Sequence, residues 1–173
     1  MASNSIQGLK VMAVDDDPMV LNLIGRCLKI YGATPILCDN AYDGIRETKN
    51  HLPDVILLDL IMNGRDGFAF LRDLRELGPG RGSDTAVVIV TGVRHPEVEA
   101  AARKAGAGYL SKPFTPATLV NAITEALNRF AGFKSNPDDT DHPVQTKWPA
   151  LQRSHANNRV LTRPTCRQRP LGG

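Results

Sequence analysis

The sequence has little of what marks secreted, membrane-spanning or zinc-binding proteins. Its three cysteines, Cys27, Cys38 and Cys166, are odd in number and show no Cys-x-x-Cys spacing, which argues against a disulfide framework and a zinc site. There is no apolar run of about 18 residues, so no transmembrane helix is predicted. Residues 1–8 lack the basic and apolar regions of a secretory signal. We therefore expect a cytoplasmic chain with reduced thiols and no membrane association.

Charge is spread unevenly along the 173 residues. Residues 134–173 hold seven Lys and Arg against three Asp, so the net charge of +3 comes from this segment. The segment also has five prolines and no helical or strand period. We predict a domain over residues 8–131 and a basic, proline-containing, disordered tail over residues 132–173. Scattered charges and the near absence of aromatic residues do not favour nucleic-acid binding by the tail.

Short apolar runs and helical patterns alternate over the first 130 residues. Three of the runs are continuous Val, Ile and Leu stretches, which are typical of strands buried on both faces of a parallel sheet. Strands that alternate with helices predict an α/β doubly wound fold. Pro35 fits an edge strand, where a missing N–H costs little. The strand runs are Val11–Val14, Ile36–Cys38, Val55–Leu58, Ala86–Val90 and Gly108–Leu110, and the helical patterns span 20–31, 41–50, 70–77, 98–105 and 119–130.

Polar side chains stand where four of these runs end. Asp15 and Asp16 follow the first run, Asp59 the third, Thr91 the fourth and Lys112 the fifth. Because the carboxyl ends of parallel strands meet at one edge of the sheet, we expect these groups to share a cleft. Clustered carboxylates favour a hard divalent cation such as Mg²⁺, and a carboxylate beside it can attack phosphorus. A lysine and a hydroxyl would neutralise the phosphoryl oxygens.

In this order and spacing, five stretches of the chain resemble the receiver domain of two-component response regulators. The similarity covers roughly residues 8–131. It implies a CheY-like, flavodoxin-like (βα)5 parallel sheet of order 2-1-3-4-5. The matching stretches are 11–18, 53–60, 62–67, 88–92 and 108–114.

The resemblance assigns the acceptor and the metal ligands. Asp59 would accept the phosphoryl group and form an aspartyl phosphate. Asp16 would ligate Mg²⁺ directly, Asp15 mainly through water, and Asp59 and the backbone carbonyl of Ile61 would complete the protein ligands. Read without the resemblance, the acidic run after the first strand is a solvated turn or an N-cap, a role that we expect for Asp17 itself.

The resemblance also assigns the groups around the acceptor. Thr91 would hydrogen-bond the phosphoryl group, Lys112 would pair with it, and the Lys112–Pro113 peptide bond would be cis. Thr91 and Tyr109 would form a conformational switch, although an aromatic residue on the last strand is also ordinary half-buried packing. One departure is Asn63, where the family usually has Pro, and we expect a more flexible loop there.

The function implied is that of a single-domain response regulator, a phosphoacceptor signalling domain and not an enzyme. A histidine kinase or a histidine phosphotransfer protein would supply the phosphoryl group, and output would be contact with an unknown downstream protein. The alternative is a Mg²⁺-dependent phosphohydrolase of the haloacid-dehalogenase type. That class has its nucleophile first in an Asp-x-Asp on the first strand, and a cap insertion. Here the candidate nucleophile, Asp59, follows the third strand, and the receiver reading is favoured.

In this family, the side chains two residues beyond the acceptor and two beyond the threonine flank the path of a hydrolytic water. Here these are Ile61 and Val93, which are apolar and cannot bind or activate water. We therefore expect slow autodephosphorylation.

Overall fold

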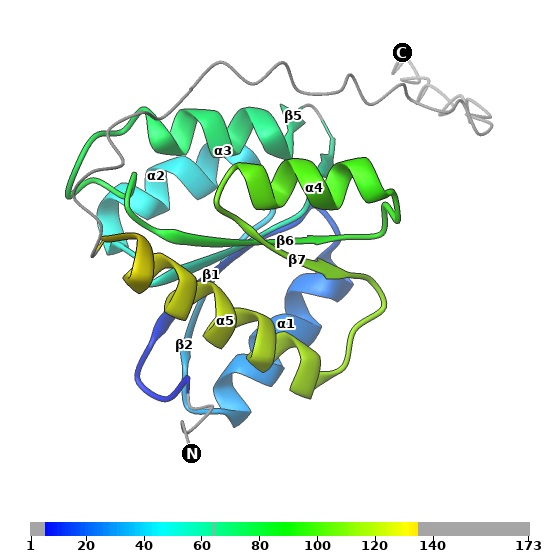
Figure 1. Cartoon of the computed structure of the whole chain (residues 1–173). Coiled ribbons are helices and arrows are strands. Elements are labelled where there is room, and N and C mark those ends of the chain that lie inside the picture. Colours follow the sequence, from blue (N-terminus) through cyan, green and yellow to red (C-terminus); the bar gives the residue numbers. More distant parts are fainter. Residues whose placement is uncertain (1–5, 64, 135–173) are drawn as a thin grey trace, which may run out of the picture.

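A five-stranded parallel sheet forms the centre of the protein (Figure 1). The structure is a computed structural model that describes residues 6–63 and 65–134. The strand order is β2-β1-β3-β6-β7, which is the predicted order 2-1-3-4-5 counted over the strands of this sheet. The predicted doubly wound α/β fold is thus confirmed, and Pro35 lies in an edge strand as expected. The strands are β1 (Lys10–Val14), β2 (Thr34–Cys38), β3 (Val55–Leu58), β6 (Ala86–Thr91) and β7 (Gly108–Ser111).

Five helices cover the two faces of the sheet (Figure 1). Side chains alternate along β1, so that Val11 and Ala13 pack with α1 and α5, whereas Met12 and Val14 pack with α2, α3 and α4. Both faces are therefore buried, which explains why the strands are continuously apolar. The helices are α1 (Pro18–Ile30), α2 (Ala41–His51), α3 (Gly67–Arg75), α4 (Pro96–Lys104) and α5 (Pro116–Lys134).

Local side chains fix where the helices begin. Asp17 caps α1 by accepting a hydrogen bond from the backbone N–H of Met19, with Pro18 at the first helical position. Asn40 caps α2 and Asp66 caps α3 in the same way. The predicted cap at Asp17 is confirmed, and it places the acidic residues before it at the end of β1.

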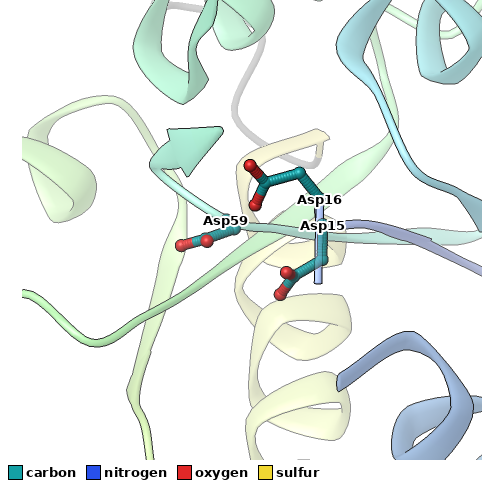
Figure 2. Close-up of side chains that lie close together, drawn as sticks. All are labelled: Asp15, Asp16 and Asp59. Carbon is teal, nitrogen blue, oxygen red and sulfur yellow. The ribbon is translucent and has the colours of Figure 1, made fainter. Parts of the chain in front are cut away.

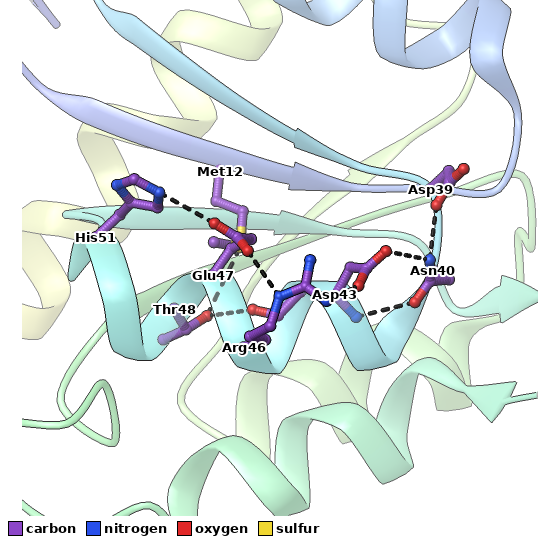
Figure 3. A network of polar contacts seen from close by, with 9 residues as sticks. Met12, Asp39, Asn40, Asp43, Arg46, Glu47, Thr48 and His51 are labelled. Atoms are coloured by element: carbon purple, nitrogen blue, oxygen red, sulfur yellow. Dashed lines mark hydrogen bonds and ion pairs between the residues drawn. The ribbon is translucent and has the colours of Figure 1, made fainter.

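A network of polar contacts runs along α2 (Figure 3). Arg46 pairs with Asp43 at 2.6 Å and with Glu47 at 2.9 Å, and His51 lies 3.0 Å from Glu47. The pKa of Glu47 is lowered, chiefly by its hydrogen bond to Arg46. Because the side chains of Arg46 and His51 are exposed, we assign these ion pairs a small role in helix stability.

Arg75 forms hydrogen bonds to the loop that leads into β6. Its Nη1 donates to the carbonyl oxygens of Ser83 at 2.6 Å and Thr85 at 2.9 Å. The guanidinium carbon also lies 5.9 Å from the centre of the Phe130 ring. Burial lowers the pKa of Arg75 from its usual value. One half-buried side chain therefore links α3, the loop 76–85 and α5.

A short ribbon that the sequence patterns do not predict lies between β3 and α3. Strands β4 (Ile61–Met62) and β5 (Arg65–Asp66) pair antiparallel, with Ile61 opposite Asp66. Two-residue strands are too short to show a period, so the sequence indicates only a flexible loop here. The ribbon matters for the site because it begins two residues beyond Asp59.

The predicted tail lies, from residue 135 onward, outside the described residues. Helix α5 continues to Lys134. Within residues 6–63 and 65–134, no helix is both long and apolar enough to cross a membrane.

Candidate functional site

Three carboxylates gather at the carboxyl ends of β1 and β3 (Figure 2). Asp15 and Asp16 follow β1, Asp59 follows β3, and the two strands pair with Val14 opposite Leu58. One carboxylate oxygen from each Asp lies within 4.8 Å of the other two. The structure thus brings together the three acidic residues that the sequence singled out.

Lys112 supplies the positive charge of the site. It follows β7, and its Nζ donates to Oδ2 of Asp15 at 2.5 Å and lies 3.3 Å from Oδ2 of Asp59. Its backbone N–H donates to the carbonyl oxygen of Thr91 at 2.8 Å, which ties the lysine to the end of β6. The Lys112–Pro113 peptide bond is cis.

Burial and charge act against each other on these groups. Burial raises the pKa of Asp59, Lys112 lowers it and Asp15 raises it, so that the net shift is upward. Burial lowers the pKa of Lys112, but its hydrogen bond to Asp15 and the charges of both carboxylates outweigh burial and raise it. The lysine therefore stays protonated, and one ammonium faces three acidic groups. The site has excess negative charge.

Backbone amides orient two of the carboxylates. The N–H of Asp17 donates to Oδ1 of Asp15 at 3.0 Å, and the N–H of Leu60 donates to Oδ1 of Asp59 at 2.8 Å. A backbone hydrogen bond from Ile61 also lowers the pKa of Asp59, and Oδ2 lies 3.3 Å from Nζ of Lys112. Backbone amides and Lys112 together therefore fix the orientation of the Asp59 carboxylate.

Two further residues shape the site and were not assigned a role from sequence. The N–H of Asn63 donates to Oδ2 of Asp16 at 2.8 Å. Gly67 donates its N–H to the carbonyl oxygen of Leu60 at 3.0 Å, and a Cβ on Gly67 would lie 2.3 Å from the carbonyl oxygen of Asp59. The unusual Asn63 was a visible signal, but a backbone donor and a close backbone approach leave no pattern in the sequence.

Thr91 and Tyr109 both hydrogen-bond to the backbone of Val93, in the segment after β6. Thr91 is fully buried, and its Oγ1 accepts the N–H of Val93 at 3.3 Å instead of contacting a carboxylate. The hydroxyl of the half-buried Tyr109 donates to the carbonyl oxygen of Val93 at 2.6 Å. Burial, more than the nearby charges, raises the pKa of Tyr109, so its phenol is a donor at neutral pH. Both side chains are thus linked through one residue.

The donor set suits a hard cation. Mg²⁺ prefers oxygen ligands and is usually bound through one or two carboxylates with retained water. The cluster offers carboxylate oxygens at short mutual distance, and it carries excess negative charge. The backbone of Ile61, in β4, lies two residues beyond Asp59. These residues fit Mg²⁺.

Known proteins share both the sequence pattern and the fold. The sequence profile described as "Response regulator receiver domain" matches residues 11–124. The chain is 28% identical over 119 residues to the chemotaxis protein CheY of Halobacterium salinarum, covering 68% of this chain and 96% of that protein. It is 29% identical to the protein PilH of Pseudomonas aeruginosa, covering 68% and 97%. The crystal structure of a response regulator receiver domain protein from Clostridium thermocellum is similar at 30% identity and a TM-score of 0.62, covering 72% and 98%.

Proposed function

Because this chain belongs to the response regulator receiver domain family, we propose that it accepts a phosphoryl group on Asp59 in a Mg²⁺-dependent phosphorelay. Receiver domains are signalling domains and not classical enzymes. The donor is a phosphohistidine of a histidine kinase or a histidine phosphotransfer protein, and the output is contact with a downstream protein. The observation that carries the proposal is the meeting of three carboxylates and Lys112 at one edge of the sheet.

The metal would be held by the oxygens of the acidic cluster. Asp15, Asp16 and Asp59 provide carboxylates, and the backbone carbonyl of Ile61 provides a further ligand. Bound there, Mg²⁺ would offset the negative charge of the cluster and of the phosphoryl oxygens.

Asp59 is the nucleophile. One of its carboxylate oxygens forms a bond to phosphorus while the bond from phosphorus to the imidazole nitrogen of the donor breaks, and the imidazole leaves with the electron pair. The N–H of Leu60 on Oδ1 holds the carboxylate in place for this approach. Lys112, 3.3 Å from Oδ2, is close enough to bind an oxygen of the incoming group.

Thr91 and Tyr109 respond to the new group. The hydroxyl of Thr91 accepts a hydrogen bond from Val93 and therefore keeps its own proton to donate to a phosphoryl oxygen. Since Tyr109 is hydrogen-bonded to the carbonyl of Val93, movement of this segment with Thr91 would change the position of the ring. This link supports the proposed switch.

Incubation with acetyl phosphate and Mg²⁺, followed by intact mass measurement, tests the proposal. We expect a phosphoryl adduct on the unaltered chain and none on Asp59→Asn or in EDTA. The control is Asp54→Asn, because Asp54 is exposed and precedes β3 at the opposite end of that strand. An adduct that forms at the full rate on Asp59→Asn, or without a divalent cation, would contradict the proposal.

A further inference from the structure

The three carboxylates of the site differ in how they are held. Those of Asp15 and Asp59 are buried, and each accepts an N–H from one or two residues further along the chain and also contacts Lys112. The carboxylate of Asp16 is partly exposed, and its hydrogen bond comes from Asn63, 47 residues away. Asp16 differs from the other two in that its backbone N–H donor lies on an element far along the chain.

We propose that the backbone N–H of Asn63 is a positioning group, which holds Asp16 toward the metal. The inference rests on the proposed function of the site. Like charges on Asp15 and Asp59 repel the carboxylate of Asp16, and the partly exposed side chain is free to turn toward solvent. A charge-assisted hydrogen bond of 2.8 Å from the N–H of Asn63 opposes that rotation.

The donor is itself held in place by the ribbon. Asn63 directly follows Met62, and the pairing of Ile61 with Asp66 and of Met62 with Arg65 fixes the strand that leads to it. Asp66 then caps α3. The orientation of a metal ligand on β1 is therefore connected, through backbone bonds, to the start of α3.

Only a residue with a backbone N–H can fill this role, which gives a clean test. Asn63→Pro removes the donor, whereas Asn63→Ala keeps it and removes only the side chain. Met62 lies in an extended strand, the conformation favoured before a proline. We expect Mg²⁺ binding, measured by isothermal titration calorimetry, to be roughly tenfold weaker in Asn63→Pro and unchanged in Asn63→Ala.

A second measurement does not depend on the metal or on the folding of the proline variant. In EDTA, the amide of Asn63 should exchange faster with solvent, and its NMR shift should move, when Asp16 is replaced by alanine. The inference would be overturned if the unaltered chain and Asn63→Pro bound Mg²⁺ equally well, or if the exchange rate and NMR shift of the Asn63 amide were unchanged in Asp16→Ala. Either result would leave the proposed function standing. Absence of Mg²⁺ binding by the unaltered chain would overturn the proposed function and this inference with it.

Discussion

Gly67, the first residue of α3, lies against the backbone that carries Asp59, and we expect Gly67→Ala to disturb both folding and phosphorylation. A Cβ on Gly67 would be 2.3 Å from the carbonyl oxygen of Asp59 and 2.8 Å from Cα of Leu60. Real Cβ atoms essentially never approach another atom closer than 3.0 Å, so the two backbones must separate by about 0.7 Å or more. Neither side of this contact is a flexible side chain.

The cost follows from the lack of room on both sides. Overpacking costs about 1–3 kcal/mol, and we expect the upper end here because Phe68 and Leu60, beside the contact, are each 1% exposed and cannot give way. For a domain of this size, about 3 kcal/mol corresponds to a loss of roughly 10 °C in Tm. Displacement of the acceptor by several tenths of an ångström should also slow phosphorylation, by up to about a hundredfold.

Differential scanning calorimetry and the rate of adduct formation with acetyl phosphate measure the two effects. Gly92→Ala is the matched control for stability, since a Cβ there meets no atom within 4 Å and its backbone is not in the left-handed region. A Gly67→Ala protein that melts within about 2 °C of Gly92→Ala would refute the packing argument. An unchanged phosphorylation rate would refute the claim that the contact positions Asp59.

Three further predictions concern the site and its support. Burial, and also the charge of Asp15, raise the pKa of Asp59 above the unfolded value of about 3.9, so ionisation of Asp59 destabilises the fold as the pH rises through the folded pKa. Urea unfolding in EDTA should therefore show Asp59→Asn to be more stable than the unaltered chain at pH 7, with the difference shrinking in acid. Arg75→Ala should lower the free energy of unfolding by about 2–3 kcal/mol, because two carbonyls of the loop 76–85 lose their donor. Ile61→Asn and Val93→Glu should speed the decay of the phosphorylated protein severalfold, since each replaces an apolar side chain with one that can bind or activate water.

Each of these predictions has a result that would contradict it. A difference between Asp59→Asn and the unaltered chain that does not change with pH would show that the carboxylate is not the cause. Arg72→Ala is the control for Arg75, because the side chain of Arg72 is 51% exposed and should change stability by less than about 0.5 kcal/mol. If the polar substitutions at Ile61 and Val93 leave the decay unchanged or slow it, apolar shielding does not set the lifetime.

The fold and the members of the acidic cluster could be predicted from sequence, because both depend on local patterns. Continuous apolar runs such as Val55–Leu58 and Val11–Val14 are explained by burial on both sheet faces, and helical spacing identified the five helices of the described residues. The polar residues at the ends of four of these runs were then expected at the carboxyl edge of a parallel sheet. Asp15, Asp16 and Asp59 could be grouped for that reason, although they are far apart in the chain.

The contacts that orient the carboxylates of the cluster depend on the tertiary structure and could not be predicted from sequence. The bond from Lys112 to Asp15 spans 97 residues, and its length depends on how β7 lies in the sheet. The donor to Asp16 is a backbone N–H on a ribbon too short to have a period. Glycine is required at position 67 because the backbone there lies against the backbone of Asp59 and Leu60. The residues next to Gly67 in the sequence give no sign of this contact. Periodicity shows which face of an element is buried, whereas backbone hydrogen bonds and close approaches exist only once the elements have packed.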